Sequence, residues 1–89
     1  MDESKIKMAM MTAAAKSLEY MKRNPKASEE EIFQHVMKVE RASGNAKIGA
    51  MAAVSRAYKY KQSNSNDTDK KIMQAIMNES EEILANMTL

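Results

Sequence analysis

The chain has 89 residues, a formal net charge of +2 and no cysteine. This length fits one domain, and the lack of cysteine excludes disulfides, a thiolate nucleophile and a cysteine-ligated zinc site. The polar start at residues 1–4 is unlike a secretory signal, and no run of about 18 apolar residues predicts a membrane span. We therefore expect a cytoplasmic protein that has no contact with membranes.

The composition favours helices. The chain contains ten methionines but only two glycines, one proline, three tyrosines and one phenylalanine. Alanine, methionine, lysine and glutamate are strong helix formers, whereas the β-branched and aromatic residues that sheets need are few. We expect an all-α fold, a compact four-helix bundle with short loops. An orthogonal, helix-turn-helix-like packing of the first three helices is the alternative architecture.

The first predicted helix spans residues 3–23. Apolar residues recur every three or four positions and so mark one face of the helix. Met11 and Ala15 widen that face, and Pro25 ends the helix because it forces the preceding residue out of the α region. The predicted buried stripe consists of Ile6, Met10, Ala14, Leu18 and Met21.

The second predicted helix spans residues 29–42 and begins with a capping box. The side chain of Ser28 is placed to accept a hydrogen bond from the backbone N–H of Glu31. The side chain of Glu31 can in turn accept one from the backbone N–H of Ser28. Gly44 follows the helix where a left-handed residue is needed. The predicted buried side consists of Ile32, Phe33, Val36, Met37 and Val39.

The third and fourth predicted helices span residues 46–62 and 68–87. Asn45 is the expected N-cap of the third, and Asp67 or Thr68 that of the fourth. The third helix is small or apolar nearly all round, which predicts that neighbouring helices enclose it. In the fourth, Ser80 interrupts the apolar stripe and marks a kink, a second helix start or a position that faces solvent.

The residues that usually carry catalysis lack partners in this sequence. His35 lies one turn from Glu31, a spacing that satisfies an exposed histidine. Glu79 and Glu82 are neighbours on one predicted helix, where carboxylates form a solvated face instead of facing each other across a pocket. Thioethers suit Cu(I), but filling of the core is the favoured role of the methionines. We expect no enzyme activity, no cofactor, no metal and no small-molecule substrate.

Two surfaces suggest that the chain binds a macromolecule. The first combines the methionine and alanine faces of the helices over 3–23 and 68–87 with a strip of small residues, spaced by four, on the helix over 46–62. Small residues let a second backbone approach closely, and methionines adapt to varied partner helices. This surface predicts a protein-interaction or self-association module whose partner is another protein or a second copy. Its expected residues are Met8, Met11, Gly49, Ala53 and Ala57.

The second surface is the segment over residues 41–66, which contains five basic residues, Arg41 among them, and no acidic residue. Such a concentration of positive charge favours contact with phosphates, so nucleic-acid binding is the alternative function. The run over residues 18–32, followed by the Gly44 turn, resembles the opening of helix-turn-helix domains. That resemblance implies a DNA-reading third helix, although at the start of this helix only Lys47 is basic. The candidate residues are Lys47, Arg56, Lys59, Tyr60 and Lys61.

Overall fold

Four helices contain nearly all the residues that the computed structural model describes, which are 3–39, 44–63 and 68–87. They are α1 (Glu3–Arg23), α2 (Glu29–Val39), α3 (Gly44–Ser63) and α4 (Asp69–Met87). None of the described residues lies in a strand, so the all-α prediction is confirmed. The radius of gyration is 12.1 Å, close to the value of about 12 Å expected for a folded chain of this length.

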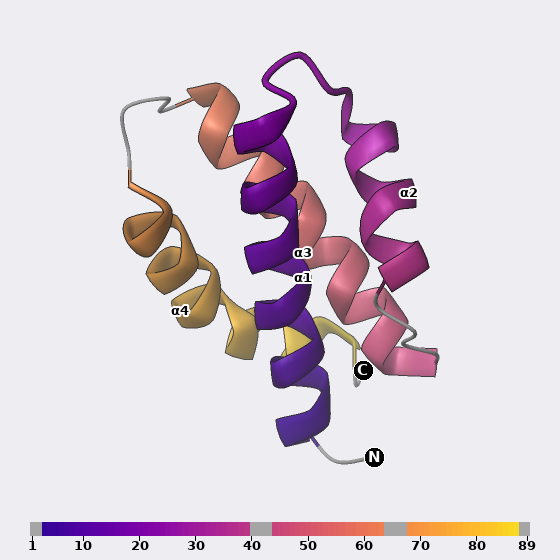
Figure 1. Ribbon diagram of the computed structural model, residues 1–89. Helices are drawn as coiled ribbons and strands as arrows, with labels where there is room; N and C mark the ends of the chain where they lie inside the picture. Colours follow the sequence, from indigo (N-terminus) through magenta and orange to yellow (C-terminus); the bar gives the residue numbers. More distant parts are fainter. Residues whose placement is uncertain (1–2, 40–43, 64–67, 88–89) are drawn as a thin grey trace.

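α1 and α3 form the centre of the molecule. Figure 1 shows α3 crossing obliquely behind α1, with α2 on one side of this pair and α4 on the other. Successive helices run in opposite directions, so that the start of α1 and the end of α4 lie at the same end of the molecule. The most extensive contact joins α1 to α3; α2 and α4 each touch both central helices, and among the described residues they do not touch each other.

The contact between α1 and α3 is lined by small residues. Gly49 lies closest, because a Cβ atom built on it would be 2.9 Å from Cγ2 of Ile6 and 3.0 Å from Cγ of Met10. The strip of small residues on α3 is therefore internal and lies outside any surface that a partner could reach. The buried small residues are Ala9, Ala13, Ala14 and Ser17 on α1, and Gly49, Ala50, Ala53 and Ala57 on α3.

Four residues of the predicted stripe on α1 are buried and the fifth, Met21, is half-buried, but the buried face is widened on the other side. Met11 is only half-buried and Ala15 is exposed, whereas Ala13 and Ser17 are fully buried. The prediction was wrong here because the width of the face depends on where α3 packs. α3 itself is not enclosed all round, since Ile48 is 53% exposed and Met51 is 41% exposed.

The predicted helix starts at Ser28 and Thr68 are confirmed. The backbone N–H of Glu31 donates to Oγ of Ser28 at 3.1 Å, and that of Lys71 donates to Oγ1 of Thr68 at 3.2 Å. These hydroxyls satisfy backbone donors that a first helical turn leaves without partners. The predicted end of the second helix at residue 42 and the candidate cap Asp67 lie outside the described residues.

Two other boundary predictions need correction. α3 begins at Gly44, which has the expected left-handed φ of 61°, so Asn45 lies inside the helix and is not its N-cap. α4 continues through Ser80, whose side chain is buried and donates to the carbonyl oxygen of Met77 at 2.6 Å. Ser80 therefore neither faces solvent nor starts a second helix, because its hydroxyl finds an acceptor on the preceding turn.

Candidate functional site

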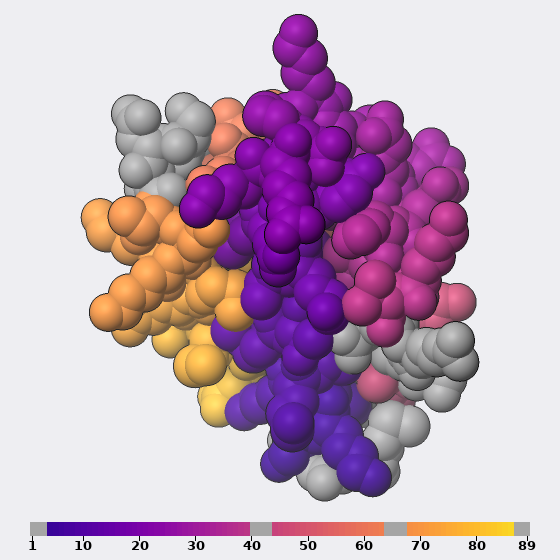
Figure 2. Space-filling model, in the orientation of Figure 1, coloured from indigo at the N-terminus to yellow at the C-terminus, as the bar shows by residue number. Residues whose placement is uncertain are grey.

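A groove of about 690 Å³ lies between α1 and α4. These two helices are far apart in sequence but in contact in the fold, and the space-filling view in Figure 2 shows α4 beside α1 on the left of the face drawn. Each helix contributes four residues to the lining. They are Lys7, Met8, Met11 and Thr12 of α1, and Met77, Asn78, Ser80 and Glu81 of α4.

Exposed methionines give the groove its apolar character. Met8 is 69% exposed and Met77 is 56% exposed, and Met11 is half-buried between them and the core. Single exposed apolar residues are common on protein surfaces. Here, however, two of the largest exposed side chains come from different helices and line the same groove, which makes this face a candidate contact surface.

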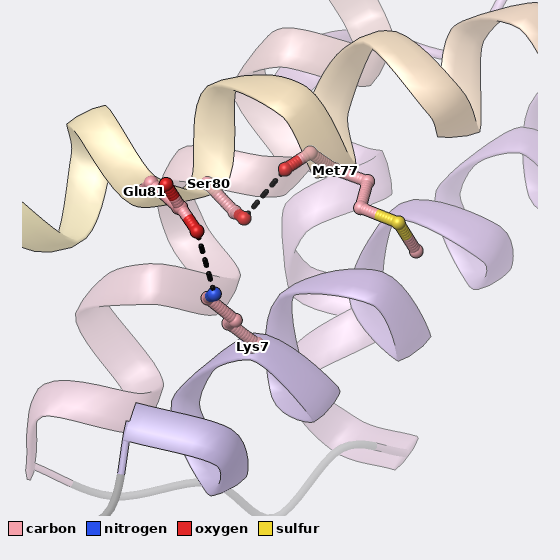
Figure 3. Close-up of polar contacts among 4 residues, drawn as sticks. All are labelled: Lys7, Met77, Ser80 and Glu81. Carbon is pink, nitrogen blue, oxygen red and sulfur yellow. Dashed lines mark hydrogen bonds and ion pairs between the residues drawn. The ribbon is translucent and has the colours of Figure 1, made fainter.

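An ion pair joins the two walls of the groove. Nζ of Lys7 on α1 lies 3.4 Å from Oε1 of Glu81 on α4, and Figure 3 shows the side chain of Met77 extending from α4 away from this pair. The side chain of Lys7 is 38% exposed and that of Glu81 is 81% exposed. A pair this open to water contributes only about 0–1 kcal/mol to stability, so its charges remain available to other partners.

The methionines that are close in sequence do not form one cluster. Met10 is fully buried in the core between the helices, whereas Met8 and Met11 line the groove. Helix geometry separates them, because successive positions on a helix point in different directions. Among the described residues, no group of three histidines or carboxylates is placed to hold a metal ion.

Part of the expected basic surface is brought together on α3. Arg56, Lys59 and Tyr60 line a pocket of about 240 Å³ with Ser63. One carboxylate of α4 serves two of these residues: Arg56 donates to Oε1 of Glu79, and the hydroxyl of Tyr60 donates to Oε2. The charge of Arg56 is therefore already paired with a carboxylate, which makes this side of α3 less attractive to a phosphate.

The hydrogen bond to Glu79 also affects the acidity of Tyr60. Donation to this carboxylate is the main reason why the pKa of the phenol is raised above its usual value. Partial burial and the negative charge of Glu79 act in the same direction, and the nearby charge of Arg56 opposes them. The interaction favours the protonated phenol because only that form can donate to the carboxylate.

The remaining basic candidates do not join this pocket. Nζ of Lys61 lies 3.1 Å from Oδ1 of Asp69, so a second acid of α4 offsets positive charge on α3. Lys47 is exposed near the opposite end of α3. Arg41 lies outside the described residues.

The two groups considered for acid–base chemistry have structural contacts that the sequence did not reveal. His35 stacks on the ring of Tyr20, with ring centroids 4.3 Å apart and an angle of 28° between the planes. Glu79 is bound by α3 instead of lying in a solvated row with Glu82, which is exposed. A single tyrosine near the end of α1 and a single histidine in α2 were a weak signal for the contact of His35, and no local pattern signals that of Glu79.

No family model matches the chain, and neither a curated protein nor a solved structure matches it. In the part of the chain that the structure describes, no helix combines the length and the apolar character needed to cross a bilayer.

Proposed function

We propose that this chain is a helical protein-interaction module without catalytic activity, and that the groove between α1 and α4 is its contact surface. The main support for this proposal is that the exposed Met8 and Met77, together with Met11, line the same groove. This surface keeps the expected methionines of α1, adds Met77 of α4 and omits the internal small residues of α3.

The physical properties of the groove support a helical partner. Its volume of about 690 Å³ is within the range of sites that bury apolar ligands. Methionine side chains are flexible and polarisable, so they can pack against varied apolar surfaces. Amphipathic helices commonly bind such grooves through side chains spaced by three and four residues.

The contacts of the ionisable residues support a role without catalysis. A catalytic acid or base must be free to reach a substrate. Glu79 is instead bound by Arg56 and Tyr60, which occupy both of its oxygens. His35 is exposed, and its ring stacks on Tyr20, so it contributes to the contact between α2 and α1.

Binding of a fluorescently labelled synthetic amphipathic helix of leucine and lysine tests the proposal. Met77→Lys should weaken this binding by about tenfold, because the contact would then bury a charge in an apolar surface. Met51→Lys is the matched control, since Met51 is also an exposed methionine but lies on α3 away from the groove. Fluorescence anisotropy measures both affinities, and equal effects of the two substitutions would rule out the groove.

Nucleic-acid binding through the basic side of α3 is the second candidate function. It is supported by the shared pocket of Arg56, Lys59 and Tyr60, and it ranks lower because Glu79 already pairs with two of these residues. A gel shift at low salt with mixed DNA and RNA tests it. Phosphate contacts predict retardation that weakens steeply with salt and is lost in the variant Arg56→Glu with Lys59→Glu. No retardation at high micromolar protein would end this candidate.

A further inference from the structure

The two walls of the groove carry opposite charges at the same position along its length. Lys7 stands on α1 and Glu81 on α4, with Nζ and Oε1 3.4 Å apart. The apolar lining is divided between the walls as well, because Met8 and Met11 belong to α1 and Met77 to α4. α1 and α4 also run in opposite directions (Figure 1).

We propose that the occupant of the groove is the same groove of a second copy of this chain, an inference that rests on the proposed function. A two-fold axis parallel to the groove places α1 of one copy against α4 of the other. Because Lys7 and Glu81 lie at the same position along the groove, Lys7 of each copy then faces Glu81 of the other. Four charges of alternating sign result, and Met8 and Met11 of one copy pack against Met77 of its partner.

Charge complementarity favours this occupant over an unrelated helix. The groove carries its own complement, since each wall presents the charge that the opposite wall of a second copy requires. A contact of this kind is isologous, with the same patch used on both subunits, and it closes as a dimer. Opposite charges facing each other across an interface also fix the register of the two copies.

The dimensions of the face are sufficient for a weak dimer. α1 has 21 residues and α4 has 19, so each helix is about 30 Å long and two adjacent helices cover a face about 20 Å wide. A contact along the whole of both helices would bury roughly 600 Å² per copy as an upper limit, which is below the value of about 800 Å² typical of stable complexes. We therefore expect a dimer that dissociates on dilution.

Charge reversal in separate chains tests the arrangement. A Lys7→Glu chain alone, and a Glu81→Lys chain alone, would each bring four like charges together, so each should dimerise at least about tenfold more weakly than the unaltered protein. An equimolar mixture of the two chains should form a heterodimer, because every charge then faces an opposite one. Sedimentation equilibrium measures the dissociation constant of the dimer for each single variant and for their mixture. The helical circular dichroism signal shows that each chain is folded.

A third variant separates the dimer contact from the ion pair within one chain. Lys7→Glu together with Glu81→Lys in the same chain restores opposite charges both within the chain and across the two-fold axis, so its dimer should match that of the unaltered protein. If the charges matter only within one chain, mixing the two single variants changes nothing, and the inference is overturned.

Separate results decide whether a second copy occupies the groove and whether the groove is a contact surface at all. Unaltered protein that sediments as a monomer at millimolar concentration overturns the second copy as occupant. If it still binds the leucine–lysine helix through Met77, the groove remains a contact surface. A dimer that Met77→Lys leaves intact uses another face, which also overturns the inference. If the protein forms no dimer and also shows no Met77-dependent binding of the helix, both proposals are overturned.

Discussion

Glu79 links α4 to α3 through both oxygens of one carboxylate. Arg56 donates to Oε1 and the hydroxyl of Tyr60 to Oε2, and the side chain of Glu79 is only 21% exposed. Hydrogen bonds to charged groups are stronger than neutral ones. We infer that this network holds the two helices in place and reduces the positive charge that α3 presents to solvent.

Replacing Tyr60 with phenylalanine should remove one of these two bonds and keep the packing of the ring. We expect the free energy of unfolding at pH 7 to fall by about 1 kcal/mol, the typical contribution of such a hydrogen bond when it is partly exposed. Urea unfolding followed by circular dichroism measures the change. Tyr58→Phe is the matched control, because the Tyr58 hydroxyl forms no hydrogen bond with any residue that the structure describes, whereas that of Tyr60 does. It should change stability much less.

The raised pKa of Tyr60 predicts how this effect varies with pH. The folded protein holds the phenolic proton more tightly than the unfolded chain, whose phenol titrates near pH 10. The extra stability is therefore complete below about pH 10 and is lost as pH rises through the higher pKa of the folded state. The stability difference between the unaltered protein and Tyr60→Phe should shrink above pH 10. Tyrosine absorbance should also show that the titration step missing from Tyr60→Phe lies above pH 10; a missing step at or below pH 10 would contradict the assignment.

Contacts between residues close in the sequence could be predicted, whereas contacts between residues far apart in the sequence could not. Ser28 and Thr68 cap helices through bonds that span three residues, so the residue types and their spacing are a sufficient signal. The bonds from Arg56 and Tyr60 to Glu79 span 23 and 19 residues. They depend on how α3 packs against α4, which no local pattern specifies.

The close packing of α1 and α3 is the main contact between elements. Small residues on both helices are buried along it, and Gly49 has no room for a Cβ atom beside Ile6 and Met10. Glycine costs about 1 kcal/mol relative to alanine inside a helix. The close approach of the two backbones gives the physical reason for a glycine here.

Gly49→Ala should destabilise the protein in spite of its better helix propensity. The added methyl group meets Cγ2 of Ile6, which is held stiffly because it branches at Cβ. Overpacking of a core costs about 1–3 kcal/mol, so we expect a net loss of about 1 kcal/mol in the free energy of unfolding. Ala15→Gly, at an exposed position of α1, measures the propensity term alone.

A double-mutant cycle identifies the clash. Ile6→Leu moves the branch from Cβ to Cγ and so removes Cγ2 at nearly constant volume. In that background Gly49→Ala should be less destabilising by at least about 0.5 kcal/mol, which is the lower end of the interaction energies measured for residues in contact. Equal effects in both backgrounds, measured by urea unfolding, would show that Ile6 is not what limits the space at Gly49.

The extent of the helices could be predicted more reliably than the way they face one another. α1 has the predicted bounds, 3–23, and its end is marked locally by Pro25. On α3, the strip with Gly49 and the side with Ile48 and Met51 were both apolar enough to be buried. The tight fit of Gly49 against α1 determines which side is inside, and that fit depends on two helices at once.

The arrangement of the four helices leaves an apolar groove with exposed methionines on both walls. α1 is covered by α3 on its small-residue side, while α1 and α4 leave Met8 and Met77 open to solvent. The sequence predicted Met8 and Met11 as contact residues. It did not predict Met77, because the fold brings residues 8 and 77 together only through the packing of α4 on α1.

The methyl NMR spectrum of methionine-labelled protein tests most directly whether this groove is the contact surface. Each methionine gives one methyl signal, and Met→Leu variants assign them. On addition of the leucine–lysine helix, and on concentrating the protein alone, we expect the signals of Met8, Met11 and Met77 to shift. Those of buried Met10 and of Met51 on α3 should stay in place. Shifts at Met51 with unchanged groove signals would contradict the proposed contact surface.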